Sequence, residues 1–196
     1  VLATLVGKTF GYKELIIETP GLTGTTLRHY FKQHSLIPKK MDFQRHYLTP
    51  SCTVSEFVDV LHSFEPHVVR GYGAHLGTLF RELAIDGTSF PHPLLIIYGA
   101  DGMPKADRWS IENQLGIPVW SSYQAVEALR IGFQCERRDG FHVNIDQIGL
   151  SIVDENGNAA SGCVQLLHDG AQVFLPADRI PPPGRGKGSG RVRNEG

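Results

Sequence analysis

The chain has 196 residues, of which 41 % are hydrophobic and 20 % are charged, and its formal net charge at pH 7 is −1. This length predicts one core domain with a smaller appendage, and the apolar runs are too short for a membrane span. From Arg179 to Gly196 there are five Lys or Arg and one Asp or Glu, which leaves a net charge of −5 on the rest. An acidic body argues against nucleic acid as a partner, and three scattered cysteines favour a reducing, cytoplasmic setting over a disulfide scaffold.

Short apolar runs alternate with helical patterns through the first two thirds of the chain. This order predicts an α/β fold with a mostly parallel sheet flanked by helices. Strands are expected at 14–18, 43–48, 66–70, 93–98 and 118–122, and helices at 23–34, at 54–63, after residues 71–73 and at 104–115. The firmest helix is 54–63, because Thr53 and Glu56 have the spacing of a capping box. The run 93–98 is apolar on both faces, which predicts a central strand.

From Gly140 onward the hydrophobic period changes from helical to alternating. This change predicts a small antiparallel β subdomain with a tight turn at 154–158. After Ile180 the chain is rich in Pro, Gly and Arg, a composition that predicts disorder. The expected organisation is therefore an α/β core over 1–135, a β subdomain over 136–178 and a disordered Gly/Arg/Pro tail over 179–196.

Two predicted strands end in residues suited to ligand contact. In α/β sheets, ligands bind beyond the carboxyl ends of the strands. Gly99, just after one strand, would let the backbone approach a planar ligand, and Tyr123, just after another, offers a ring to stack on it. The carboxylate of Glu127 suits a Mg²⁺ ion that travels with phosphates. From the residues alone, these are also ordinary loop and helix-cap positions.

Several motifs, in order and spacing, resemble the adenylate-forming enzymes of the phenylacetate–CoA ligase branch, which includes capsular polysaccharide biosynthesis homologues. The resemblance covers roughly residues 10–160. It rests on residues 98–101, Arg108, 111–112, 123–128, 135–136, 140–143, Asp146, 152–154 and Gly157. Enzymes of this family join a carboxylate to ATP, which gives an acyl-adenylate and pyrophosphate, and then transfer the acyl group to the thiol of coenzyme A.

The resemblance implies roles for individual residues. Tyr123 matches the aromatic residue near adenine, and Glu127 matches the acidic residue that holds Mg²⁺ against the ATP phosphates and serves catalysis. Gly99, Ala100 and Asp101 fall where the family's backbone passes the adenine and the acyl pocket. Gln124 and Asp146 complete the implied ATP or AMP contacts. The implied partners are a small carboxylic acid, ATP and coenzyme A; the sequence does not name the acid.

The sequence also departs from the family pattern. Gln124 stands where the family usually has Gly, and Val126 stands where it usually has Thr. The segment 21–26 lacks the Gly and Lys of the family's phosphate loop, so it is interpreted as a helix N-terminus. The downstream ribose-binding segment and the Lys-bearing C-terminal domain have no clear counterpart. The chain is therefore expected to be a fragment of the N-terminal domain, inactive on its own.

A metal site is the next candidate. In this branch a zinc shell that includes Cys135 and His142 is implied, and Cys163 is a further cysteine that could join it. The later Cys-x-Cys pair is missing here, which leaves a partial Zn²⁺ site. The alternative is a buried cysteine beside a surface histidine.

Two further interpretations stay open. Gly71, Gly73 and Gly77 follow a predicted strand and open a helix, which is the setting of a Rossmann-like dinucleotide site. The ordinary explanation of the same glycines is a tight strand-to-helix turn. The third interpretation is a non-catalytic remnant that acts as a binding domain.

Overall fold

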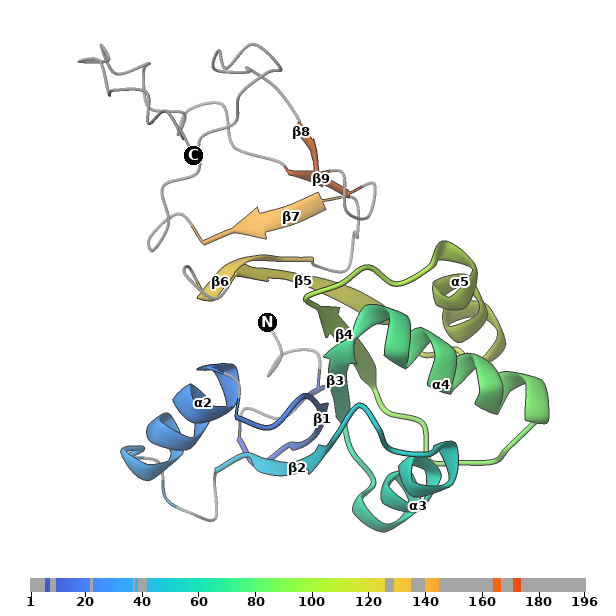
Figure 1. Cartoon of the computed structure of the whole chain (residues 1–196), viewed down its shortest axis with the longest axis horizontal. Helices are drawn as coiled ribbons and strands as arrows, with labels where there is room; N and C mark the ends of the chain where they lie inside the picture. Colours follow the sequence, from blue (N-terminus) through green and yellow to red (C-terminus); the bar gives the residue numbers. More distant parts are fainter. Residues whose placement is uncertain are drawn as a thin grey trace, which may run out of the picture.

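The structure is a computed structural model that describes residues 6–7, 10–21, 23–36, 38, 42–125, 129–134, 140–144, 164–166 and 171–173. Strands and helices alternate through most of the chain (Figure 1). In chain order they are β1 (Lys13–Ile17), α2 (Thr23–Gln33), β2 (Gln44–Leu48), α3 (Val54–Phe64), β3 (Val68–Tyr72), α4 (Gly73–Asp86), β4 (Leu95–Gly99), α5 (Lys105–Gln114), β5 (Val119–Ala125), β6 (Leu129–Phe133), β7 (Gly140–Val143), β8 (Val164–Leu166) and β9 (Ala171–Val173).

The strands form one sheet in the order β2-β1-β3-β4-β5-β6-β7-β9-β8. The first five are parallel, and from β5 to β7 the neighbours are antiparallel. The predicted α/β class, with a mostly parallel sheet followed by antiparallel strands, is confirmed. The order 2-1-3-4-5 is that of a doubly wound sheet, in which the carboxyl ends of the parallel strands share one edge. Gly99, at the end of β4, and Tyr123 and Gln124, near the end of β5, lie at that edge.

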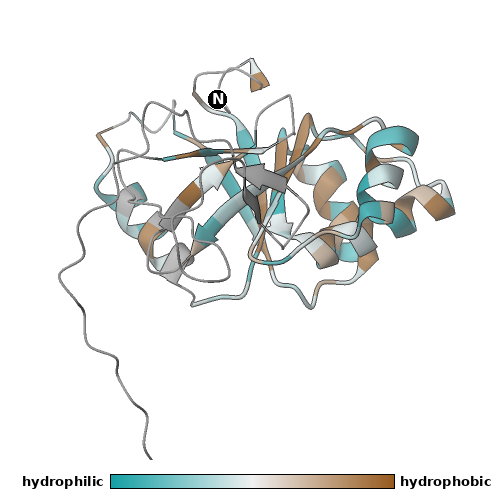
Figure 2. Ribbon diagram, turned by 90° about the horizontal axis from the view of Figure 1, so that it is seen from above, coloured by the Kyte–Doolittle hydropathy of each residue, from teal (hydrophilic) through white to brown (hydrophobic). Residues whose placement is uncertain are grey.

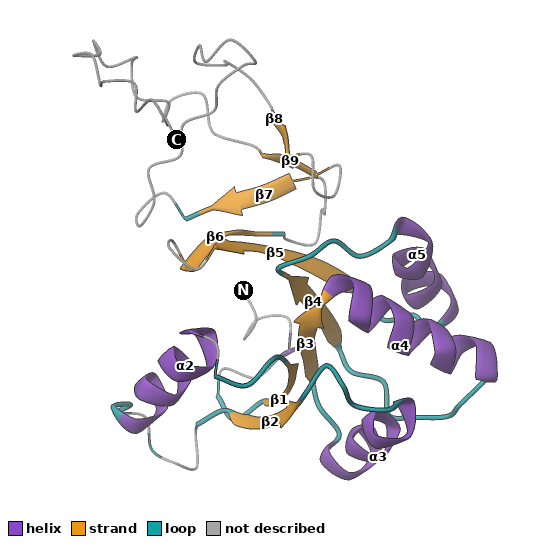
Figure 3. Ribbon diagram, viewed as in Figure 1, coloured by secondary structure: helices purple, strands orange, loops and turns teal. Residues whose placement is uncertain are grey.

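Helices cover both faces of the parallel strands. α3, α4 and α5 lie on one face, and α2 lies on the other (Figures 1 and 3). The side-chain alternation of a strand divides the core accordingly. The larger cluster is Leu15, Ile17, Phe57, Leu61, Val69, Leu76, Leu79, Phe80, Leu83, Phe90, Ile96, Tyr98, Met103, Ile111, Ile117 and Val119. The smaller cluster is Val6, Tyr12, Val68, Leu95, Ile97 and Trp120. Figure 2 shows the hydrophobic colour concentrated on the central strands.

Three local predictions are confirmed. Thr53 Oγ1 accepts a hydrogen bond from Glu56 N at 3.2 Å, and Glu56 Oε2 accepts one from Thr53 N at 2.8 Å, so the capping box of α3 is complete. Every residue of β4 is buried, as expected for a central strand. The segment 21–26 leads into α2, which begins at Thr23, as interpreted from its sequence. None of the helices in the described ranges is long and apolar enough to cross a membrane.

The structure differs from the sequence-based expectation after Ser122. β5 continues to Ala125, and residues 129–133 form β6, a strand that the sequence did not predict. The reason is pairing: each strand supplies the hydrogen-bond partners of the other. The expected domain boundary at residue 135 falls between β6 and β7, which pair in one sheet, and it stays a prediction. The predicted turn at 154–158 and the tail 179–196 lie outside the described residues.

Candidate functional site

The candidate site is built on the carboxyl ends of β4 and β5. These strands are parallel neighbours, and Tyr98 pairs with Ser121. A Cβ atom on Gly99 would lie 2.7 Å from Gln124 Nε2 and 2.9 Å from the Ser122 carbonyl oxygen. Glycine is therefore required at position 99 because β4 and β5 approach each other too closely there for a side chain. The expectation that both strands end at one edge holds, although they end at Gly99 and Ala125 rather than at Tyr98 and Ser122.

The loop after β4 has an unusual backbone. Ala100 has a φ of 71°, in the left-handed region that residues other than glycine rarely adopt, and its side chain is exposed. Such a conformation costs roughly 1–3 kcal/mol and persists only where the surroundings enforce it. Here the next residue, Asp101, is hydrogen-bonded to the first amides of α4, which helps to hold the loop in this conformation.

A substitution tests the backbone conformation at Ala100. We expect Ala100→Val to lower the free energy of unfolding by about 2 kcal/mol, because a β-branched residue is strongly disfavoured at positive φ. Ala100→Gly serves as the matched control and should be at least as stable as the wild type, because glycine adopts this conformation without strain. Urea unfolding of the three proteins measures the difference. Equal stability of the valine variant would show that the loop can relax.

Asp101 ties this loop to α4. The Tyr72 side chain at the N-cap of α4 makes no capping bond. The Asp101 carboxylate takes that place: Oδ1 accepts from Gly73 N, and Oδ2 accepts from Ala74 N at 3.3 Å. A carboxylate at a helix N-terminus satisfies free amides and interacts favourably with the helix dipole. Asp101 therefore fixes the position of the loop relative to the helix.

Close packing accounts for the glycines of the dinucleotide-like motif. A Cβ on Gly73 would lie 2.7 Å from backbone atoms of Gly102 and Met103, and one on Gly77 would lie 2.8 Å from Asp107 Oδ2. A Cβ on Gly71 would lie 3.1 Å from the Ile17 carbonyl oxygen. These glycines permit close packing, and the α4 amides that a pyrophosphate would need are bound by Asp101. The geometry therefore supports the tight strand-to-helix turn.

Tyr123 lies within β5, next to an irregularity of the strand. It pairs with Gly132 of β6, and the register shifts between Tyr123 and Gln124. Bulges of this kind redirect side chains and are common beside functional sites. The Tyr123 ring is half-buried, and its centroid is 6.1 Å from that of Phe141 at an interplanar angle of 58°. The sequence predicted the tyrosine as a stacking residue but did not predict Phe141 as its neighbour.

The metal-binding candidates are only partly described. His142 is exposed, and its ring stacks on Phe133 across β6 and β7, with centroids 5.5 Å apart. Cys135, Cys163, Glu127 and Asp146 lie outside the described residues. Within the part of the chain that the structure describes, no group of three potential metal ligands comes together. The zinc and magnesium sites stay predictions.

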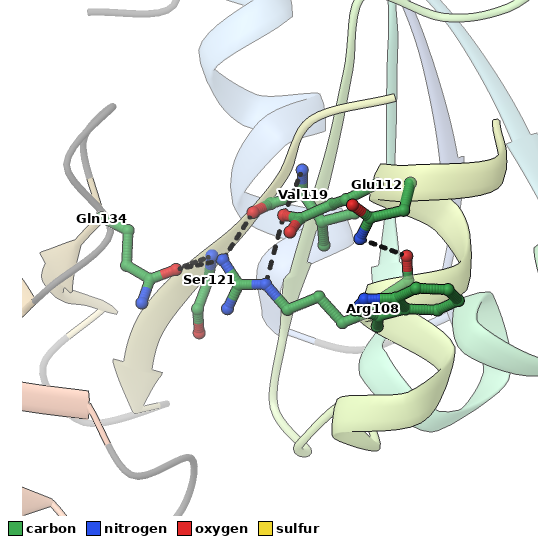
Figure 4. Close-up of polar contacts among 7 residues, drawn as sticks. Arg108, Glu112, Val119, Ser121 and Gln134 are labelled. Carbon is green, nitrogen blue, oxygen red and sulfur yellow. Dashed lines mark hydrogen bonds and ion pairs between the residues drawn. The ribbon is translucent and has the colours of Figure 1, made fainter. Parts of the chain in front are cut away.

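A polar network anchors β5 beside the site (Figure 4). Arg108 on α5 donates from Nη2 to the Val119 carbonyl oxygen at 2.9 Å, and its Nε pairs with Glu112 at 3.3 Å. Gln134 Oε1 accepts from Ser121 N at 2.9 Å and from Arg108 Nη2 at 3.5 Å. The network joins α5, β5 and the end of β6, and so fixes the strand that carries Tyr123. The Arg108–Glu112 spacing is readable in the sequence as an i,i+4 pair; no local signal reveals Gln134.

Comparisons with known proteins place the fold. No family model matches the sequence, and no curated protein matches it. Among solved structures, the anthranilate CoA ligase AuaEII in complex with anthranoyl-AMP is similar over 87 % of this chain, with 13 % identity and a TM-score of 0.51. Two VinN structures, the second a complex with L-aspartate, cover 82 % and 71 % of this chain, with 15 % and 14 % identity and TM-scores of 0.49 and 0.45. This chain spans 35 to 39 % of those chains. The chain therefore has the fold of part of the anthranilate CoA ligase.

Proposed function

We propose that this chain is the nucleotide-binding part of an adenylate-forming enzyme that activates a carboxylic acid with ATP. The observation that carries the proposal is the close approach of Gly99 to Gln124 at the carboxyl ends of two parallel strands. The half-buried Tyr123 lies on the same strand as Gln124, and its ring offers an aromatic face to a flat base. The fold shared with AuaEII, whose structure contains anthranoyl-AMP, supports the same conclusion.

In the proposed reaction, a carboxylate oxygen attacks the α-phosphorus of ATP, and the bond to pyrophosphate breaks. The product is an acyl-adenylate, whose acyl carbon the thiol of coenzyme A then attacks, with AMP leaving. A step of this kind needs positioning and charge stabilisation rather than a protein nucleophile. Mg²⁺, when bound, would neutralise charge on the phosphates, and Glu127 is the proposed residue that holds it.

The proposed roles follow from position. The Tyr123 ring stacks on adenine, and the Gly99–Ala100 backbone lies along the edge of the base. Gln124 lies against Gly99 and offers an amide to the nucleotide, and Asp146 is proposed as a further nucleotide contact. Asp101 acts as a positioning residue, because its carboxylate holds the loop against α4. A partial zinc site at Cys135 and His142 is a separate proposal.

Calorimetric titration tests the nucleotide site directly. We expect the chain to bind ATP with Mg²⁺ and to bind AMP. Tyr123→Ala should weaken both affinities about tenfold, because base–aromatic stacking contributes roughly 1–3 kcal/mol. Tyr123→Phe keeps the ring and should bind like the wild type. Glu127→Ala should weaken ATP with Mg²⁺ but leave AMP unchanged. Binding of a nicotinamide dinucleotide instead, or no binding at all, would contradict the proposal and favour the dinucleotide module or the non-catalytic remnant, respectively.

A further inference from the structure

A charged cluster lies on three neighbouring strands, away from the candidate nucleotide site. Glu14 of β1 is buried, with a residue exposure of 3 %. Its Oε2 accepts from Arg45 Nε of β2 at 3.0 Å, and its Oε1 accepts from Arg70 Nε of β3 at 2.9 Å. One carboxylate thus joins two guanidinium groups across the sheet. Glu14 is the second residue of β1, so it lies near the amino end of the strand, whereas the nucleotide site lies at the carboxyl ends of β4 and β5.

The cluster has unused hydrogen-bonding capacity. Each guanidinium reaches Glu14 through Nε alone, and neither guanidinium makes another hydrogen bond or ion pair in the part of the chain that the structure describes. The terminal Nη groups therefore have no protein partners among the described residues. In arginine, these groups can bind a carboxylate or a phosphate through two parallel hydrogen bonds. The Arg45 guanidinium is further held over the Phe43 ring, 5.3 Å from its centroid.

The charge of the cluster and the burial of its arginines both favour binding of an anion. Two arginines and one glutamate leave a net charge of +1. The side chains of Arg45 and Arg70 are only 18 % and 17 % exposed, so water screens this charge less than it would at the surface. Both side chains nevertheless keep some exposure to solvent. A group with one negative charge would neutralise the cluster and supply the missing acceptors.

We infer that Arg45 and Arg70 form a binding site for a small oxyanion, with one carboxylate or phosphate group held by the Nη atoms of both arginines while Glu14 keeps their Nε atoms in place. The site is independent of the proposed nucleotide function. It is built from β2, β1 and β3, and its residues share no hydrogen bond with the loop after β4 or with Tyr123 in the described structure.

Arginine side-chain NMR tests the site in the intact chain. Titration with inorganic phosphate, and separately with acetate, at constant ionic strength set with sodium chloride, should shift the Nε–Hε signals of Arg45 and Arg70. Arg81 of α4 pairs with Asp107 of α5, so its signal should stay unchanged and provides the internal control. A response to phosphate alone identifies the tetrahedral anion, and a response to acetate alone identifies the planar one. Equal shifts at all three arginines, or none, would overturn the inference.

Variants give a second readout. Phosphate or acetate should raise the melting temperature of the wild type above that in chloride, and the apparent affinity should fall at least about tenfold in Arg45→Gln and in Arg70→Gln. Each variant leaves Glu14 one arginine, so its ion pair is not lost entirely. Arg81→Gln is the matched control, because it also removes an arginine from a buried carboxylate, and it should keep the anion effect. An anion effect that survives in Arg45→Gln and Arg70→Gln contradicts the site.

Discussion

Replacing Glu14 with glutamine is expected to lower the free energy of unfolding by about 3 kcal/mol at neutral pH, since removing one member of a buried ion pair leaves the others uncompensated. The amide oxygen can accept from only one side, and the amide nitrogen then faces a guanidinium. Because Arg45 and Arg70 retain some exposure, water offsets part of the loss. Urea unfolding measures the effect. Glu82→Gln, a half-buried carboxylate of α4, is the control and should change stability little.

The same residue makes stability depend on pH. Burial alone would raise the pKa of Glu14, but the charges of Arg70 and Arg45 and one hydrogen bond from each arginine outweigh it, and the pKa is lowered. The stabilisation is therefore complete above the pKa of an unfolded glutamate, about 4.3, and is lost as the pH falls through the lower pKa of the folded state. The wild type and Glu14→Gln should converge in stability in acid. A constant difference at every pH would contradict this assignment.

Gly73→Val is expected to lower the free energy of unfolding by about 3 kcal/mol and to abolish adenine-nucleotide binding. A Cβ at this position meets main-chain atoms of Gly102 and Met103, which cannot rotate away as a side chain can. The loop must shift, and the Asp101 bonds to α4 must break with it. Thermal unfolding and calorimetry measure the two losses.

Ala74→Val is the matched control for this substitution. It places the same side chain one residue further along α4, where the alanine is exposed. We expect a cost below about 1 kcal/mol, from helix propensity alone, and normal nucleotide binding. A Gly73→Val protein as stable as this control would show that the loop yields easily.

The sequence predicts the fold well where the determining contacts are local. The capping box before α3 and the uninterrupted apolar run of β4 carry their signals within a few residues, and both are confirmed. The sequence of β6 carries no such local signal. Residues 129–133 are a short run without the flanking turn residues that mark a hairpin, and the strand is defined by its pairing with β5. A strand whose partner fixes it cannot be found from its own pattern.

The candidate site shows the same division. The hydrophobic run of β4 locates Gly99 at the end of that strand, whereas Tyr123 was expected just after a strand and lies inside β5, which continues to Ala125. The bond of Asp101 to α4 spans 28 residues to Gly73, and that of Arg70 to Glu14 spans 56. Contacts of this kind depend on the packing of whole elements, so no local spacing predicts them. Gln134 belongs to the same class, because its partner Ser121 lies on the facing strand.

The capping of α4 by Asp101 has a consequence for motion. The carboxylate belongs to the loop beside the proposed base, and the amides that it binds are those of Gly73 and Ala74, at the start of α4. A molecule that settles against Ala100 without disturbing the loop would slow the solvent exchange of the Gly73 and Ala74 protons, and one that pushes the loop aside would accelerate it. The exchange rates of these two amide protons would therefore show whether a bound molecule leaves the loop undisturbed.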